Sequence, residues 1–148
     1  MPRSPIALTI VLTMIFTTTC AIAQVPNLNS ITSSVNVQSD LVQNTTDDRQ
    51  ILFHHLVRVD GASSLQIRFG RTLLPEGCLI RMTSLEDGAV QHHRARTLSQ
   101  WRQASAWFNG TSVLVELVAE PGAGPARLDI KEARVLEQLG GERRSFCG

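Results

Sequence analysis

The chain has 148 residues, 18% of them charged, and a formal net charge of +1 at pH 7. So small a charge creates no strong electrostatic field, which argues against nucleic acid or an anionic membrane as a partner. The cations are 13 arginines and one lysine scattered along the chain, a distribution typical of solvated faces rather than of a binding stripe.

The first 23 residues are predicted to be a secretory signal peptide. Arg3 gives a basic start, Ile6–Phe16 is an apolar run, and small residues lead to an A-x-A site that places cleavage between Ala23 and Gln24. The apolar run is shorter than the ~20 residues that a membrane span needs. A lipoprotein would instead be cleaved before Cys20. Lipoprotein processing favours a smaller residue than Thr19 at the position before that cysteine. We expect a secreted or periplasmic protein with no membrane span in its mature form.

Removal of residues 1–23 leaves 125 residues with a formal charge of 0, because Arg3 is the only charged residue removed. That length is typical of one domain that can bury a core. Residues 24–50, rich in Ser, Asn, Thr and Gln, are predicted to be a loosely ordered lead-in with one edge strand near Ser34–Gln38. Residues 51–136 are predicted to form the folded domain, and residues 137–148 a C-terminal tail or linker.

The first half of the domain predicts three strands. Ile51–Val59 is the first, ended by the turn signal Asp60-Gly61. Ser64–Phe69 alternates apolar and polar residues, as a half-buried strand does. Cys78–Ser84 follows a turn at Leu74–Gly77, and its apolar residues also share one parity.

The second half predicts shorter elements. Ala89–Arg94 is a candidate strand, and Thr97–Trp101 could form one turn of helix. Asn109-Gly110 is the strongest short hairpin signal in the chain, and it predicts a hairpin between Ala106–Phe108 and Ser112–Ala119. The segment Ser112–Ala119 is apolar on both faces, which indicates a central strand that is covered on both sides.

The final strand is predicted over Arg127–Leu136, after a loop at Pro121–Pro125. The alternation of apolar and polar residues along this strand goes out of phase at Glu132, and a β-bulge would explain the interruption. Short strands at regular intervals with turn signals between them indicate an all-β fold, and we predict an antiparallel β-sandwich of jelly-roll type.

Two histidine pairs, His54-His55 and His92-His93, are candidate metal ligands. Adjacent strand residues point to opposite faces, so neither pair can give two ligands to one ion without distortion. One histidine from each pair could converge, but no cysteine or carboxylate completes a tetrahedral set at a recognisable spacing. We interpret them as surface or hydrogen-bonded core histidines, and the loop carboxylates as turn formers rather than calcium ligands. The sequence therefore predicts neither a metal nor a cofactor.

Trp101, Trp107 and Phe108 are expected to anchor the core, because the chain is poor in aromatic residues. The alternative is an aromatic surface, formed by Trp101 and Trp107, that stacks on a sugar. Serines and histidines are present, but none lies in a G-x-S-x-G or GDSGG context, so we assign no catalytic residue.

Cys78 and Cys147 remain after processing. In an exported protein two cysteines usually form a disulfide, which would stabilise the fold by roughly 4 kcal/mol in the chain-entropy model. Cys147 is the second-last residue, however, and could equally pair with a cysteine outside this chain.

Several segments between Ile51 and Gly148 resemble, in their order, the N-terminal non-catalytic β-sandwich module that precedes trypsin-like serine peptidase domains in secreted bacterial proteins. The matching segments are LQIRFG (Leu65–Gly70), LPEG (Leu74–Gly77), MTSLEDGAVQ (Met82–Gln91), LSQW (Leu98–Trp101), SAWFNG (Ser105–Gly110), VLVELVAEPGAGPARLDI (Val113–Ile130) and SFCG (Ser145–Gly148). In that family the terminal Cys-Gly resembles a hinge into the peptidase domain. Cys78 departs from the family, where a residue other than cysteine is expected.

The resemblance implies an accessory module without catalysis of its own, truncated or orphaned from a longer serine endopeptidase. Such a module would assist folding, dock onto a peptidase domain, or present a surface to substrate or cell envelope. The alternative function is a stand-alone extracellular module that binds carbohydrate or another surface. A third class, metal binding by the histidines, would require a melting temperature that rises with metal.

Overall fold

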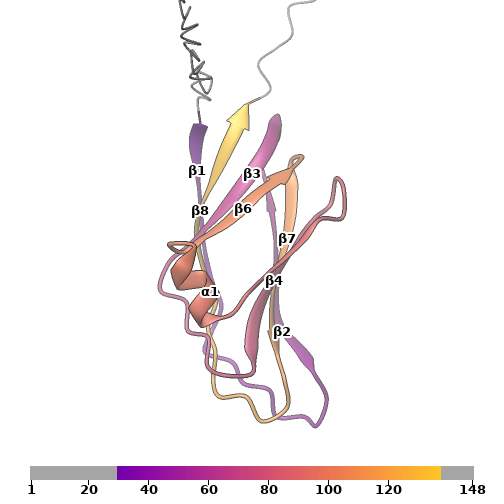
Figure 1. The fold of residues 1–148 in the computed structure, drawn as a ribbon, viewed down its shortest axis with the longest axis vertical. Coiled ribbons are helices and arrows are strands. Elements are labelled where there is room, and N and C mark those ends of the chain that lie inside the picture. The colour runs from indigo at the N-terminus through magenta and orange to yellow at the C-terminus, as the bar shows by residue number, and fades with distance from the viewer. Residues whose placement is uncertain (1–29, 138–148) are drawn as a thin grey trace, which may run out of the picture.

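The computed structural model describes residues 30–137, which form an all-β, antiparallel structure with one short helix. Eight strands form two four-stranded sheets, ordered β1-β8-β3-β6 and β2-β7-β4-β5 (Figure 1). The elements are β1 (Ser30–Gln38), β2 (Gln50–Arg58), β3 (Ala62–Phe69), β4 (Cys78–Ser84), β5 (Val90–His93), α1 (Ala95–Gln100), β6 (Ala104–Asn109), β7 (Ser112–Ala119) and β8 (Asp129–Glu137). The predicted signal peptide with its cleavage site, the tail after residue 137 and Cys147 lie outside the described residues.

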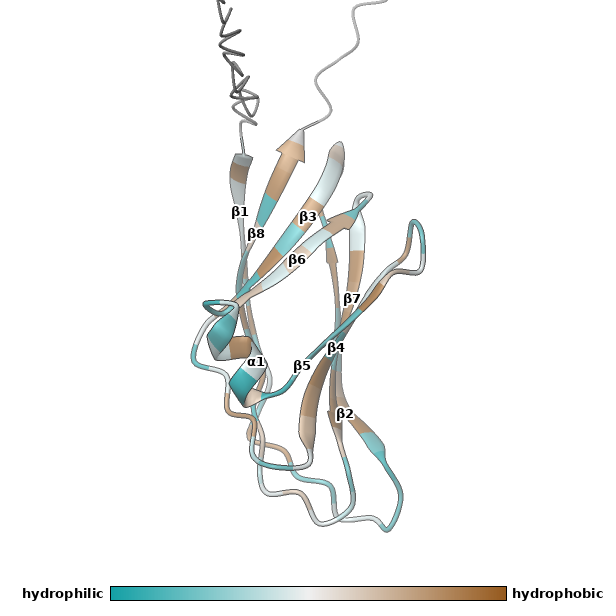
Figure 2. Cartoon of the chain, in the orientation of Figure 1, coloured by the Kyte–Doolittle hydropathy of each residue, from teal (hydrophilic) through white to brown (hydrophobic). Residues whose placement is uncertain are grey.

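The chain crosses between the sheets at every connection except that from β4 to β5. Residues of both sheets contribute to one buried apolar cluster, which includes Ile67 of β3, Ile80 and Met82 of β4, and Leu117 of β7, all fully buried. Figure 2 shows hydrophobic residues recurring along β4, β7 and β8. The core therefore depends on side chains from both sheets.

Several predicted strands are confirmed. β3 and β4 contain Ser64–Phe69 and Cys78–Ser84, and every second residue of each is buried, as the alternation requires. The edge strand predicted at Ser34–Gln38 is longer, because β1 begins at Ser30 and pairs with β8. The segment after β1 is also tied down, since the buried Asn44 side chain donates to the carbonyls of Asp48 (2.8 Å) and Ala119 (3.1 Å). The predicted lead-in thus contains a strand of nine residues and an anchored loop.

Asn109-Gly110 forms a turn, but the predicted hairpin is wrong. β6 pairs with β3, whereas β7 pairs with β2 and β4, so the turn links the two sheets. Gly110 has a φ of 87°, and its N–H donates to the Ser63 carbonyl of β3 at 2.9 Å. An Asn-Gly pair favours a reversal of direction, but the partners of the flanking strands depend on which apolar faces meet.

The β-bulge predicted in the last strand is confirmed. In the ladder between β3 and β8, Arg68 is opposite Glu132 and Phe69 is opposite Ile130, so Lys131 is the extra residue. Ile130 and Ala133 can therefore both be buried in the core although they are three residues apart.

The helical turn expected at Thr97–Trp101 is confirmed as α1, which begins two residues earlier and buries only Leu98. Arg102 and Gln103 follow it in the left-handed region, with φ of 52° and 59°. The Gln103 carbonyl accepts a hydrogen bond from the Phe69 N–H at 2.8 Å, which pins this turn to β3. Among the described residues, no helix has the length and apolarity that crossing a membrane requires.

A close approach joins the end of β3 to the start of β8. The Asp129 carboxylate accepts a hydrogen bond from the Arg71 N–H at 2.7 Å, and the Asp129 N–H donates to Thr72 Oγ1 at 3.1 Å. A Cβ atom on Gly70 would overlap the Asp129 carboxylate. A side chain at position 70 would therefore require the Asp129 carboxylate, held by the Arg71 N–H, to move.

Candidate functional site

The surface with the most distinctive chemistry lies on the second sheet. We call it the outer face; it consists of the residues of β2, β7, β4 and β5 that point away from the core. Register places His54 opposite Glu116, Glu116 opposite Arg81, and Arg81 opposite His92. These four residues therefore form one ionisable row across the sheet.

Arg81 and Glu116 make a bidentate ion pair in the centre of this row. Arg81 donates from Nε to Glu116 Oε2 at 2.6 Å and from Nη2 to Oε1 at 3.0 Å. Glu116 is only 6% exposed, and its hydrogen bond raises the pKa of the Arg81 guanidinium. Two parallel charge-assisted bonds hold both side chains in one geometry. The pair is thus suited to anchoring a surface rather than to exchanging protons with a substrate.

Apolar side chains flank the ionisable row on both sides. On one side Leu56 of β2 and Val90 of β5 are exposed, with the half-buried Leu114 in register with Leu56. On the other side Ile51 is exposed beside Val118, which is buried outside the core cluster. The central position predicted for β7 is confirmed, but its outer face is not covered across its full width. The outer face therefore combines a central ion pair with exposed apolar side chains on both sides of it.

The sequence-based reasoning missed Arg81 and Glu116. A signal was available, because each is a lone charge inside an otherwise apolar strand, and the two charges have opposite sign. A charge in the middle of a buried strand needs a partner. The pairing of β4 with β7 brings the two together.

The histidine pairs do not form a metal site. His54 and His92 share the outer face, but β2 and β5 are opposite edges of the sheet, three strand spacings or about 14 Å apart. His55 and His93 are on the core-facing side, and buried His93 donates a hydrogen bond from Nε2 to the Ala104 carbonyl at 3.1 Å. Burial lowers the pKa of His93. Within residues 30–137, no group of three or more His, Cys, Asp or Glu side chains could hold a metal ion.

The expectation that both tryptophans anchor the core is wrong. Trp101 is 48% exposed and Trp107 is 41% exposed, whereas Phe108 is buried. Phe108 lies opposite Leu65 in the core, so its neighbour Trp107 must point to the other side of β6. The ring of Trp101, just after α1, lies 5.7 Å from the ring of His93 at an angle of 57°.

Cys78, at the start of β4, is buried and forms no disulfide with another residue of the described range 30–137. Its Sγ lies 3.9 Å from the Gly124 carbonyl, and burial raises its pKa. β8 ends far from the start of β4, at the opposite end of the sheets (Figure 1). Because Cys147 lies outside the described residues, its pairing with Cys78 stays a prediction.

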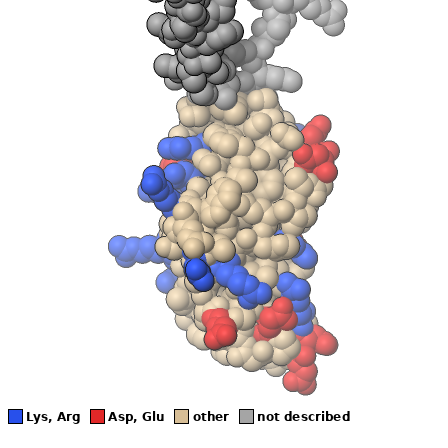
Figure 3. All heavy atoms as spheres, in the orientation of Figure 1, with Lys and Arg blue, Asp and Glu red and all other residues tan. Residues whose placement is uncertain are grey.

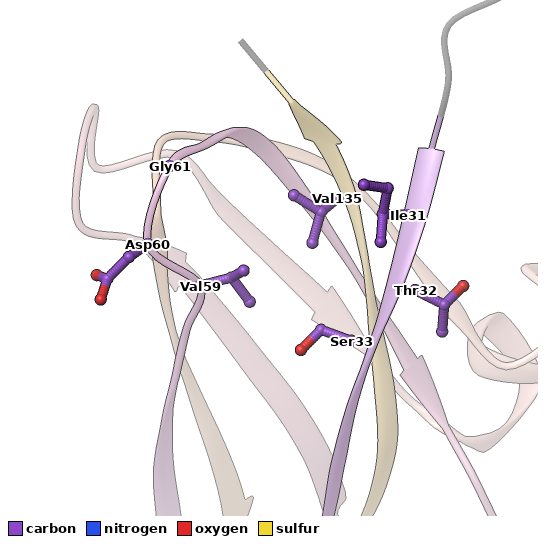
Figure 4. A pocket seen from close by; sticks show the side chains of 7 residues that line it. All are labelled: Ile31, Thr32, Ser33, Val59, Asp60, Gly61 and Val135. Carbon is purple, nitrogen blue, oxygen red and sulfur yellow. The ribbon is translucent and has the colours of Figure 1, made fainter.

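A hollow of about 540 Å³ lies between β1 and the β2–β3 connection. Figure 4 shows Ile31, Val59 and Val135 around it, with the Asp60 carboxylate pointing away from them. Asp60 is the only ionisable residue among those lining the hollow, and it pairs with Arg58 at 2.9 Å. Among residues 30–137, the lining of the hollow therefore offers no second ionisable group with which an acid–base pair could form.

Comparisons of the chain with protein-family models, with curated proteins and with solved structures found no match.

Proposed function

We propose that the chain is a non-catalytic accessory module of an exported protein, built as a jelly-roll β-sandwich, that docks onto a folded protein partner through the outer face. The order of the strands and the single core that both sheets share support the sandwich. Export rests on the predicted signal peptide. The resemblance to modules that precede trypsin-like serine peptidase domains supplies the class of partner, a peptidase domain.

The observation that carries the docking role is the set of large apolar side chains left exposed on the outer face. Ile51, Leu56 and Val90 remain exposed around the ion pair of Arg81 and Glu116. Exposed apolar side chains gathered on one face can mark a surface that contacts another protein, and their burial against a partner is favourable by about 25 cal/mol per Å² before the costs of association. A central charged pair whose bonds are already satisfied can enter such an interface with little further desolvation.

The docking test uses a purified secreted bacterial trypsin-like peptidase domain, titrated with the mature chain and followed by sedimentation velocity. We expect a complex that Leu56→Asp weakens at least tenfold, because the new charge would lose its water in an apolar contact. Thr32→Asp is the matched control, because Thr32 is exposed on β1 of the other sheet. No complex with the wild-type chain, or equal loss in both variants, would contradict docking through the outer face.

The absence of catalysis is tested separately with casein and peptide esters. We expect no turnover by the mature chain, because Arg81 and Glu116 bind each other and Asp60 binds Arg58. Turnover that a serine-directed inhibitor blocks would overturn the non-catalytic assignment.

A second candidate function, carbohydrate binding, is favoured by the exposure of Trp101 and Trp107. Exposed indole rings offer flat apolar faces on which sugar rings stack. A shift of tryptophan emission to shorter wavelength on addition of a soluble polysaccharide would support this function, and an unchanged spectrum across neutral and acidic polysaccharides would refute it.

A further inference from the structure

We propose that the surface around α1 binds an anionic polysaccharide, an inference that rests on the second candidate function and names both its ligand class and its site. The site consists of Arg94, Arg96, Trp101 and Arg102, which we call the basic patch. It is distinct from the outer face and does not include Trp107.

The basic patch carries a local excess of positive charge. All three arginines are exposed, and none forms an ion pair with another residue in the part of the chain that the structure describes. No acidic residue occurs between Asp87 and Glu116 in the sequence. The six residues of α1 span about 9 Å, so Arg94 just before the helix and Arg102 just after it lie near its two ends. Figure 3 shows Lys and Arg side chains gathered around the position of α1, while acidic side chains lie mostly toward the ends of the molecule.

The aromatic part of the patch is held in place by a constrained turn. Trp101 is half exposed and lies against the ring of buried His93. Arg102 and Gln103 are consecutive non-glycine residues in the left-handed region, a conformation that costs free energy and that often occurs at binding sites. Hydrogen bonds from the Arg102 N–H to Ser99 and from the Gln103 N–H to Leu98, at 2.9 and 3.0 Å, maintain it. The turn thus carries two exposed side chains, Trp101 and Arg102, at consecutive positions of a constrained segment.

This combination favours a saccharide over a membrane or an acidic peptide. Leu98 is the only large aliphatic side chain of α1 and it is buried, so the helix offers no aliphatic side chain that could enter a bilayer beside Trp101. An acidic peptide would satisfy the arginines but needs no aromatic ring. A uronic acid unit offers a ring that stacks on indole and a carboxylate that guanidinium groups bind in bidentate fashion.

One acidic residue lies beside the patch and provides a further test. Arg94 and Arg96 line a hollow of about 350 Å³ together with the loop before β4, which carries Glu76. A carboxylate in this position repels an anionic ligand. Its removal should therefore strengthen binding.

The experiment measures binding of the mature chain to polygalacturonate and to alginate at low and high ionic strength. We expect the triple variant Arg94→Gln, Arg96→Gln and Arg102→Gln to weaken binding about tenfold, since each exposed charge contributes a severalfold effect. Trp101→Ala should weaken it about fivefold through lost stacking, and Trp107→Ala should leave it unchanged. Circular dichroism and thermal unfolding of each variant confirm that the fold is retained.

The matched pair Glu76→Gln and Glu86→Gln makes the same change in net charge at two places. We expect about twofold tighter binding for the first and a smaller change for the second, because Glu86 lies in the turn after β4 and is not among the residues lining the hollow. Equal effects of the two variants would show that only net charge matters, and would overturn the assigned site.

Three further outcomes decide the proposal. Equal binding to polyglutamate with no effect of Trp101→Ala, or binding only to phosphatidylglycerol vesicles, would overturn the saccharide as ligand. Binding to neutral dextran that depends on Trp107 would overturn the basic patch but leave carbohydrate binding in place. Absence of binding to every acidic and neutral polysaccharide would refute both.

Discussion

Replacement of Arg81 by methionine would leave the Glu116 carboxylate, which is 6% exposed, without its two side-chain donors. Breaking a fully buried ion pair by removing one partner costs about 3–5 kcal/mol. The Arg81 side chain is 36% exposed. Water therefore screens part of the pair, and we expect the free energy of unfolding to fall by about 2–3 kcal/mol. At about 4 °C per kcal/mol for a domain of this size, Tm should fall by about 8–12 °C.

Urea unfolding of the mature chain, followed by tryptophan fluorescence and circular dichroism, measures this loss. The double variant Arg81→Met with Glu116→Leu should return to within about 1 kcal/mol of the wild type, because no charge is then left unpaired on an apolar surface. Arg58→Met is the control, because its pair with Asp60 is solvent-exposed and should contribute less than about 0.5 kcal/mol. The single variant Glu116→Leu completes the comparison. The reasoning is refuted if Arg81→Met costs no more than Arg58→Met, or if the double variant loses as much as Arg81→Met and Glu116→Leu lose separately when added.

Three further predictions concern buried groups and backbone packing. Burial holds the pKa of His93 below its ordinary value of 6.5, so the unfolded chain binds more protons there and stability should fall as the pH drops below that value. His93→Gln should flatten this dependence of Tm on pH, whereas His92→Gln, at an exposed site, should leave the dependence unchanged. Identical pH profiles for the two variants would contradict the role of buried His93. In a mature chain whose other cysteine is replaced by serine, the Cys78 thiol should react with a chromogenic thiol reagent only as the protein unfolds, and rapid reaction of the native state would disprove its burial. Gly70→Ala should lower the free energy of unfolding in urea by about 1–3 kcal/mol, because the added Cβ overlaps the Asp129 carboxylate. Gly124→Ala, where the added Cβ makes ordinary contacts, should change it by less than about 0.5 kcal/mol. Equal losses would count against the close approach of Gly70 to Asp129.

The sequence by itself determined the local elements of the fold. Alternation in Ser64–Phe69 and Cys78–Ser84 predicted β3 and β4, and the phase slip at Glu132 predicted the bulge beside Lys131. These features follow from strand geometry, in which successive side chains point to opposite faces and one extra residue reverses the phase. They need no knowledge of which strands are neighbours.

Only the tertiary structure decided which strands pair and which side chains remain exposed. Asn109-Gly110 connects two sheets instead of two paired strands, Trp107 points outward because Phe108 occupies the core position, and Arg81 meets Glu116 only because β4 lies beside β7. Pairing and burial depend on contacts between residues far apart in the chain, and local patterns carry no information about those partners.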